Sequence, residues 1–148
     1  MKKKQNDPPC PCGGKGGVFL YRDCCGPFIN DNKPAPSAEQ LMRSRYTAYA
    51  LGNADYILAT WHASTRPAEL TLESPGTPHS TRWLGLEIHS HTQLNATEAQ
   101  VMFTARYREA GRAGRLKELS RFVLENEQWF YLDGDIQPQP KNSALSAL

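Results

Sequence analysis

The chain has 148 residues, a formal net charge of +2 and 39% hydrophobic residues. This length suits one domain with a substantial core and a small appendage, because two full-sized domains need more residues. The net charge is too small to indicate nucleic-acid binding by itself. No apolar run approaches the ~20 residues that cross a bilayer, and polar residues and prolines follow the lysine-rich start where a signal peptide has its apolar core. We therefore expect a cytoplasmic protein.

All four cysteines lie in one short segment, between Cys10 and Cys25. Disulfides do not persist in a reducing cytosol, and two bridges here would need a strained ring between Cys24 and Cys25 or two crossing links in a very short loop. Four soft thiolates are the ligand set that tetrahedral Zn²⁺ favours. The sequence therefore predicts one structural zinc ion held by Cys10, Cys12, Cys24 and Cys25, with no open position for catalysis.

The two cysteine pairs are tight, because one residue separates the first pair and none separates the second. Such pairs need a backbone that can bend around an ion, and glycine adopts positive φ at low cost. Five glycines beside the cysteines offer this freedom: Gly13, Gly14, Gly16, Gly17 and Gly26.

The residues after the cysteines predict two helices. Ser37 and Gln40 are the ends of a capping box, and apolar residues recur at helical spacing from there to Gly52. Asn53 can cap a second, shorter helix whose apolar stripe runs as far as Trp61. The two helices are expected to form a lid.

The hydrophobic period changes to two from Arg82 onward, which is typical of β-strands. In the first strand, Leu84, Leu86 and Ile88 are predicted to share one face. A second alternation follows and ends in a hairpin loop at residues 111–114. The residues that form this alternation are Ala99, Val101, Phe103, Ala105 and Tyr107.

Two more strands complete the predicted sheet. The third carries Leu116, Phe122 and Leu124 on one face, and residues 125–127 turn the chain into a fourth strand that begins near Trp129. Helices first and antiparallel strands afterwards are the order of an α+β fold. The aromatic side chains expected in the core are Tyr46, Tyr49, Trp61 and Trp129.

The N-terminal segment resembles a known zinc motif. Cys10-Pro11-Cys12-Gly13, followed by residues 21–26 (YRDCCG), resembles the SEC-C motif, the zinc-binding tail of the preprotein translocase ATPase, which occurs in many otherwise unrelated bacterial proteins. The loop from Cys12 to Cys24 is a few residues longer than usual, and the second copy of the motif seen in some relatives is missing. In the translocase the motif engages the export chaperone SecB, so the resemblance implies a protein partner, with a SecB-like chaperone as one candidate.

The remainder resembles the YchJ family of uncharacterised bacterial proteins. The resemblance is carried by the segments LMRSRY (41–46), ADY (54–56), TWH (60–62), WLGL (83–86) and SRF (120–122). In that family the main domain resembles the NTF2-like fold, a cone of helices against a curved sheet. We therefore expect a zinc module over residues 1–32, an NTF2-like α+β domain over 33–136 and a disordered tail over 137–148.

Two charged residues fall on predicted apolar faces. Arg45 shares a helix face with Leu41 and Ala48, and Glu118 shares a strand face with Leu116. A charge on an apolar face needs a partner. We expect an Arg45–Glu118 ion pair that fastens the helix to the sheet, and the alternative is a polar pocket in which the two residues bind a ligand.

The histidines could serve as bases or as metal ligands. His89 and His91 are two apart, on one side of a predicted strand, but no third ligand is evident nearby. His62 and His79 stand alone. No nucleophile motif is present and every cysteine is assigned to zinc, so the sequence gives no indication of catalysis.

Three functions are compatible with these features. The preferred one is a protein-interaction adaptor that uses the zinc module. The second is a small-molecule binder or enzyme with an NTF2-like pocket containing Arg45 and Glu118. The third is single-stranded nucleic-acid binding through Lys15, Phe19, Tyr21 and Arg22, and the near-neutral charge of a zinc-loaded segment counts against it.

Overall fold

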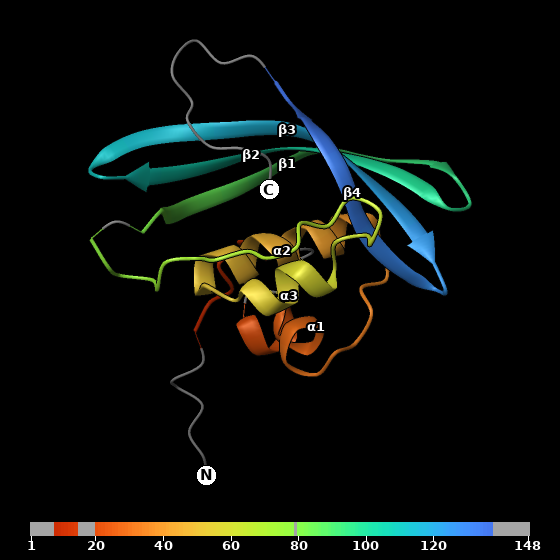
Figure 1. The fold of residues 1–148 in the computed structure, drawn as a ribbon, viewed down its shortest axis with the longest axis horizontal. Coiled ribbons are helices and arrows are strands. Elements are labelled where there is room, and N and C mark those ends of the chain that lie inside the picture. The colour runs from red at the N-terminus through yellow and green to blue at the C-terminus, as the bar shows by residue number, and fades with distance from the viewer. Residues whose placement is uncertain (1–7, 15–19, 79, 138–148) are drawn as a thin grey trace.

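The computed structural model describes residues 8–14, 20–78 and 80–137. Its elements in chain order are η1 (Tyr21–Asp23), α1 (Gly26–Asn30), α2 (Ala38–Leu51), α3 (Ala54–Ala59), β1 (Arg82–Asn95), β2 (Glu98–Glu109), β3 (Arg112–Glu125) and β4 (Gln128–Ile136). Figure 1 shows a curved sheet with α2 against one face, and α1 and α3 on the far side of α2. The predicted α+β class, with helices packed on an antiparallel sheet, is confirmed.

Both predicted helix starts are confirmed by their caps. The Ser37 hydroxyl accepts a hydrogen bond from the Gln40 amide at 3.2 Å, and Gly52, whose φ of 76° is left-handed, caps the C-terminal end of α2. The Asn53 side chain accepts a hydrogen bond from the Tyr56 amide at 3.0 Å, which caps α3. These local signals therefore set where each helix begins.

Helix α3 is shorter than predicted, because it ends at Ala59. The expectation that Trp61 belongs to the stripe of this helix is wrong. Residues 60–62 instead run parallel to β4: the Tyr131 amide donates to the Thr60 carbonyl at 2.9 Å, and the His62 amide donates to the Tyr131 carbonyl at 2.8 Å. Pairing with a distant strand overrides the local helical pattern.

The four strands form an antiparallel meander in the order β1-β2-β3-β4, joined by two-residue turns. The predicted loop at 111–114 is too long: Ala110 and Gly111, with φ of 51° and 80°, make the turn. Gly114 lies within β3, where a Cβ atom would come within 2.5 Å of the Tyr107 ring. This glycine therefore reflects close packing inside the sheet and not a turn.

The first strand contradicts part of the predicted alternation. Leu84 has no partner on β2, because the register passes from Trp83 opposite Tyr107 to Gly85 opposite Arg106. This bulge leaves Leu84 46% exposed and turns Trp83 toward the core. An extra residue in one strand shifts the alternation of all the side chains before it.

The core lies between the inner face of the sheet and α2. The alternations predicted for β2 and β3 are confirmed, and the aromatic residues Tyr46 and Trp129 are buried as expected. On the far side of α2, Ser44 bonds to the hydroxyl of Tyr56 on α3 at 2.7 Å. Helix α2 is thus enclosed on two sides. The buried residues of the sheet are Ala99, Val101, Phe103, Ala105, Tyr107, Leu116, Glu118, Ser120, Phe122, Trp129 and Tyr131.

β4 ends at Ile136, the predicted domain boundary, and one further residue still pairs with β3. The Gln137 amide donates to the Lys117 carbonyl at 2.8 Å, so this residue continues the pairing with β3. The rest of the tail predicted to be disordered, residues 138–148, lies outside the described residues.

Candidate metal centre

Four sulfur atoms converge beside α1. The Sγ atoms of Cys10, Cys12, Cys24 and Cys25 all lie within 4.8 Å of one another. The Cys12 and Cys24 sulfurs are 3.5 Å apart, well beyond the ~2.05 Å of a disulfide bond, and all four thiols are free. Three of them are buried and Cys24 is half-buried. The structure thus brings together the four residues that the sequence predicted as ligands.

Glycine backbone shapes the loop around the first cysteine pair. Gly13 and Gly14 have φ of 88° and 85°. The Gly13 amide donates to the Cys10 carbonyl at 3.0 Å, and the Gly14 amide donates to the Cys12 sulfur at 3.3 Å. The freedom predicted for these two glycines is therefore used at the site, whereas residues 16–17 lie outside the described residues.

The sulfur cluster packs against α2. The Thr47 hydroxyl donates to the Cys25 sulfur at 3.3 Å and lies 3.6 Å from the Cys10 sulfur. Arg43, one helical turn earlier, donates to the Cys12 carbonyl at 3.2 Å and lies 3.9 Å from its sulfur. Donors of this kind favour thiolates over thiols and orient metal ligands. The sequence analysis assigned neither Thr47 nor Arg43 to the metal site, because each contacts cysteines far away along the chain.

Crowding changes the acidity of the thiols. Burial and the charge of Cys12 raise the pKa of Cys24 to about 12. Hydrogen bonding to Cys10 and Cys12 raises the pKa of Cys25. The pKa of Cys10 is lowered, because Cys10 accepts hydrogen bonds from Cys12 and Cys25. Without a cation, ionisation of Cys10 therefore opposes ionisation of Cys24 and Cys25. A divalent cation removes the conflict, because its charge lets all four sulfurs ionise.

The donor set fits a closed metal site. Around a tetrahedral ion with bonds of ~2.3 Å, sulfurs are about 3.8 Å apart, which is compatible with four Sγ atoms inside 4.8 Å. Four protein ligands leave no position for water, so a bound ion would cross-link the chain and would not act on a substrate. Such an ion would tie the loop of Cys10 and Cys12 to the start of α1.

The cysteine segment and the main domain share one core. Cys10, Cys12 and Cys25 belong to the same buried cluster as Leu41 and Met42 of α2. The predicted boundary between residues 32 and 33 stays a prediction. The contact with α2 nevertheless means that the segment is a third layer of the fold and does not hang free of it.

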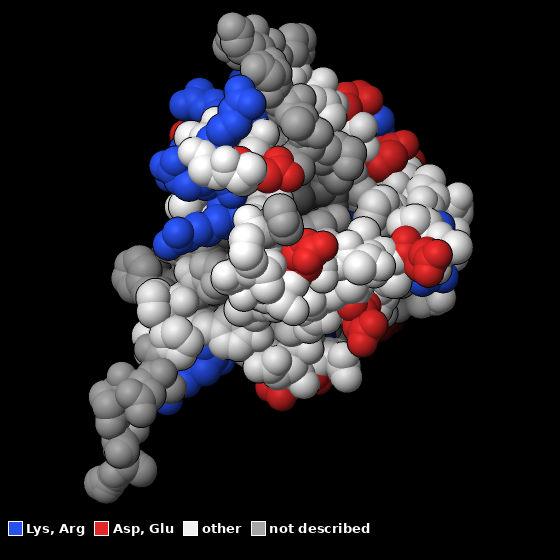
Figure 2. All heavy atoms as spheres, turned by 60° about the vertical axis from the view of Figure 1, so that its left-hand side comes forward, with Lys and Arg blue, Asp and Glu red and all other residues white. Residues whose placement is uncertain are grey.

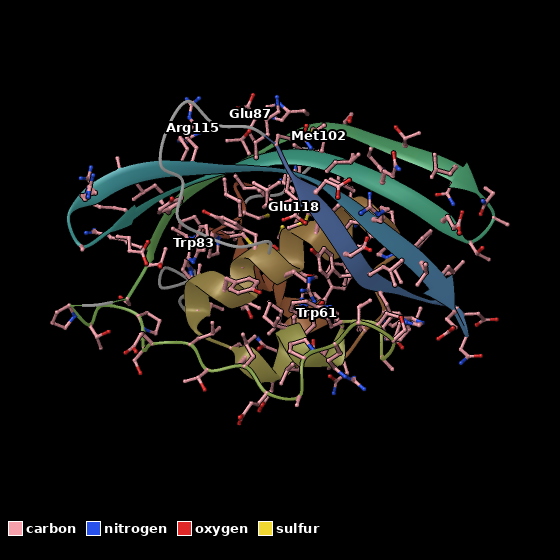
Figure 3. All side chains as sticks on the ribbon, turned by 45° about the horizontal axis from the view of Figure 1, so that its top comes forward. Trp61, Trp83, Glu87, Met102, Arg115 and Glu118 are labelled. Carbon is pink, nitrogen blue, oxygen red and sulfur yellow. The ribbon has the colours of Figure 1, made fainter. Side chains whose placement is uncertain are left out.

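Arg45 and Glu118 are both fully buried between α2 and the sheet, and Figure 3 shows Glu118 on the helix side of the strands. Tyr131 contacts both residues. The Arg45 guanidinium lies 4.5 Å from the centroid of the Tyr131 ring, and the Tyr131 hydroxyl donates to the Glu118 carboxylate at 2.8 Å. The Ser120 hydroxyl donates to the same carboxylate oxygen at 2.8 Å. A direct ion pair between Arg45 and Glu118 stays a prediction.

The same network reaches α3 and β4. Arg45 donates to the Ile57 carbonyl and to the Thr60 hydroxyl, each at 2.8 Å. Burial lowers the pKa of Arg45, while nearby tyrosines and Glu118 raise it. A Cβ atom at Gly134 would overlap the Glu118 carboxylate, so glycine there makes room for the acid. Buried polar groups with these partners join two helices to two strands.

The histidine pair does not form a chelating site. A second bulge in β1, at His89, puts the two rings on opposite faces of the sheet, so the expectation that they share a side is wrong. His89 bonds to the Thr104 hydroxyl at 2.7 Å, whereas His91 lies 3.8 Å from Glu39 of α2. Among the described residues, only the four cysteines form a group that could hold a metal ion.

Two further predicted residue sets are only partly described. His62 bonds to the Ser64 hydroxyl at 2.7 Å and to Glu125 at 3.2 Å, and His79 lies outside the described residues. Of the four residues proposed for nucleic-acid contact, Tyr21 and Arg22 belong to η1. Lys15 and Phe19 fall outside the described ranges.

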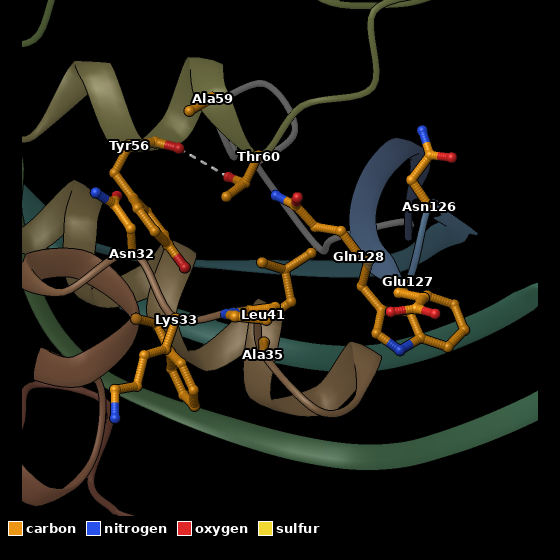
Figure 4. A pocket seen from close by; sticks show the side chains of 13 residues that line it. Asn32, Lys33, Ala35, Leu41, Tyr56, Ala59, Thr60, Asn126, Glu127 and Gln128 are labelled. Carbon is orange, nitrogen blue, oxygen red and sulfur yellow. Dashed lines mark hydrogen bonds between the residues drawn. The ribbon is translucent and has the colours of Figure 1, made fainter.

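A hollow of about 370 Å³ opens between the α1–α2 connection, α3 and the β3–β4 turn (Figure 4). Its floor includes Leu41 and Trp129, which are buried, and its rim carries Lys33 and Glu127, which are exposed. Neither Arg45 nor Glu118 lines it. The ligand pocket predicted around those two residues is therefore not this hollow.

Comparison with known proteins decides the family. Residues 37–134 match the family model described as "YchJ, middle NTF2-like domain". The chain belongs to the YchJ family. This family member is 54% identical to a UPF0225 protein of Polaromonas naphthalenivorans over 136 residues. The matched segment covers 86% of this chain and 96% of that relative. A UPF0225 protein of Bordetella pertussis is 49% identical over 140 residues, which cover 93% of this chain and 100% of the relative.

Two solved structures have the same fold as this YchJ family member. A SEC-C motif containing protein from Rhodopseudomonas palustris, solved in solution, is 28% identical, with a TM-score of 0.72 over 88% of this chain and 100% of that one. A SEC-C motif containing protein from Psychrobacter arcticus, solved by crystallography, is 28% identical, with a TM-score of 0.66 over 90% of this chain and 85% of that one. The expected family and NTF2-like fold are confirmed. Within the described residues, no helix has the length and apolar content to span a membrane.

Thr47→Val tests the contribution of α2 to the metal site. Valine keeps the volume but removes the hydroxyl that contacts two sulfurs, so metal affinity should fall by ~10- to 100-fold. Competition with a coloured chelator measures this. Ser44→Ala is the matched control, because it removes a buried hydroxyl of the same helix that bonds to Tyr56 and not to sulfur. Equal affinity of Thr47→Val and the parent protein would contradict the assignment.

Arg45→Met and Glu118→Leu test the predicted staple between helix and sheet. If the two charges stabilise each other, either change alone leaves a buried charge without its partner. Each single variant should therefore lose ~3–5 kcal/mol of unfolding free energy. The double variant should recover much of that loss. Urea unfolding of all four proteins measures the coupling. Small and additive effects would instead indicate that water reaches both residues.

Proposed function

We propose that this YchJ family member is a structural zinc protein whose cysteine module presents a fixed surface to another protein. The observation that carries the proposal is the convergence of four free sulfurs within 4.8 Å, three of them buried against α2. Thiolates are soft ligands, and an all-sulfur tetrahedral set is typical of structural Zn²⁺. Ordering of this segment would then depend on the ion.

The outward side of the module offers the contact surface. The side chains of Arg22 and Asp23 are 56% and 59% exposed. Next to them is a hollow of about 170 Å³ whose lining includes Asp23, Cys24 and Phe28. Its size suits a single side chain of a partner. The resemblance to the SEC-C motif suggests a SecB-like chaperone as one partner to test.

Metal content tests the first half of the proposal. Purified protein should carry about one Zn²⁺ per chain by elemental analysis. Replacing any one of Cys10, Cys12, Cys24 or Cys25 by Ser removes a thiolate and should weaken retention of the ion by orders of magnitude. Ser37→Ala, which changes a hydroxyl outside the site, should keep full occupancy. A metal-free protein with four reactive thiols would refute the zinc assignment.

Chelation tests how the ion supports the fold. Because most of the buried residues lie between α2 and the sheet, removing the ion should disorder the cysteine segment and leave the strand signal in circular dichroism. The thermal midpoint of the remainder should fall, since α2 loses a layer that packs on it. Complete unfolding on chelation would contradict the expectation that α2 and the sheet hold together without the cysteine segment. An unchanged midpoint would contradict the contact with α2.

A charge reversal tests the interaction surface. Deleting residues 1–32 would strip a layer from α2, so a single surface change is the sharper probe. Asp23→Lys should remove partners from the set captured by the metal-loaded, tagged protein and identified by mass spectrometry. Glu69→Lys makes the same charge change at an exposed site elsewhere and should retain them. Identical sets from both variants would refute this surface as the contact.

A further inference from the structure

The face of the sheet turned away from the helices carries a concentration of positive charge. Five exposed cations on β1, β2 and β3 form what we call the basic patch: Arg82, Arg106, Arg108, Arg115 and Lys117. Figure 3 shows Arg115 projecting from this face, on the opposite side of the sheet from Glu118. In Figure 2, Lys and Arg side chains gather along one side of the upper half of the molecule.

The strand register places like charges directly opposite each other. Arg82 pairs with Arg108, and Arg106 pairs with Arg115. Like charges at such positions destabilise a sheet. Within the described residues, no carboxylate forms an ion pair with any member of the basic patch. The carboxylate of Glu87 lies on the same face, in line with Thr104 and Lys117, and is 3.7 Å from His89. The repulsion within the two arginine pairs is therefore not relieved by a direct ion pair.

The opposite end of the sheet is different. Arg121, farther along β3, is neutralised by Asp133 at 2.6 Å and by Asp135 at 2.9 Å. The other carboxylates near that end are Glu98, Glu125 and Glu127. The positive area is therefore short, and a partner that extended far along the strands would meet negative charge.

We propose that the basic patch binds a short acidic segment of another protein. Outward side chains repeat every ~6.8 Å along a strand, and alternate side chains of an extended polypeptide have the same spacing. Arginine also binds carboxylates through two parallel hydrogen bonds. Leu84, which the bulge leaves 46% exposed next to Arg82, adds an apolar contact that suits a polypeptide.

The surroundings of the basic patch favour a polypeptide over a nucleic acid. Single-stranded nucleic acids stack their bases on exposed aromatic rings. The nearest ring on β1, Trp83, packs against Tyr46 and Tyr107 inside the core. A duplex or a long single strand would also extend past the patch toward Asp133 and Glu125, which repel phosphates.

Fluorescence anisotropy with a short labelled peptide rich in Asp and Glu tests the proposal on the metal-loaded protein. The peptide should bind at low ionic strength and weaken as salt rises. Arg106→Glu combined with Arg115→Glu should weaken binding by at least ~tenfold. Lys33→Glu combined with Arg66→Glu makes the same change in net charge at exposed sites on loops and should stay within ~twofold of the parent.

A stability measurement separates binding from folding. The single change Arg115→Glu places a carboxylate directly opposite Arg106. The thermal midpoint of this variant should therefore stay the same or rise, while peptide binding falls. Failure of the parent protein to bind the peptide at low ionic strength would overturn the proposal. Equal losses from both double variants would also overturn it. Tighter binding of an oligonucleotide with the same number of charges would assign the patch to nucleic acid instead.

Discussion

The contact between the sulfur cluster and α2 is the constraint on which the arrangement of the molecule depends. One side of α2 packs on the sheet through residues such as Arg45, whose guanidinium lies 4.5 Å from the ring centroid of Tyr131 on β4, and the other side meets the cysteines through Thr47. A helix enclosed on two sides must bury polar side chains, and each of these needs a partner. The Thr47 hydroxyl bonds to the Cys25 sulfur, and the Ser44 hydroxyl bonds to the hydroxyl of Tyr56. Any ion bound by the cysteines would therefore act on the core of the domain through one helix.

Irregularities in the strands position the polar groups that the fold uses. In β4 the register passes from Tyr131 opposite Phe122 to Asp133 opposite Arg121, which leaves Leu132 unpaired. The side chains after this bulge change faces. Two aspartates thereby point outward to Arg121, and Gly134 turns inward opposite Ser120, where it leaves room for the buried Glu118. The bulges in β1 separate the histidines and expose Leu84 in the same way.

The features that the sequence predicted correctly have a local or chemical cause. The caps at Ser37 and Asn53, the two strand alternations and the clustering of cysteines can each be read within a short window of residues. The wrong predictions concern Trp61, Leu84, the 111–114 loop and the pair of histidines. The place of Trp61 outside α3, the bulge at Leu84 and the separation of the histidines depend on pairing with strands elsewhere in the chain, and single-residue shifts in register leave no mark in composition or periodicity. The loop was predicted too long because Gly114, which packs against Tyr107 inside the hairpin, resembles a turn residue.

In the candidate sites, too, residues with a local signal could be predicted and residues brought together by the fold could not. The four cysteines could be named from spacing alone, whereas Thr47 and Arg43 become visible only when α2 lies beside them. The basic patch likewise depends on register, since its arginines are spread over three strands and the net charge of the chain is only +2. Long-range geometry, and not residue type, decided which polar side chains meet.

The pairing of residues 60–62 with β4 has a consequence for behaviour at high concentration. A strand with unpaired amides and carbonyls is a template on which another chain can add. β4 bonds to β3 on one side and, at Tyr131, to the 60–62 segment on the other, so its middle is closed to such growth. Among the described strands this leaves β1 as the open margin. Its repeated bulges interrupt the flat ladder that fibril formation requires, so the sheet resists polymerising from either side.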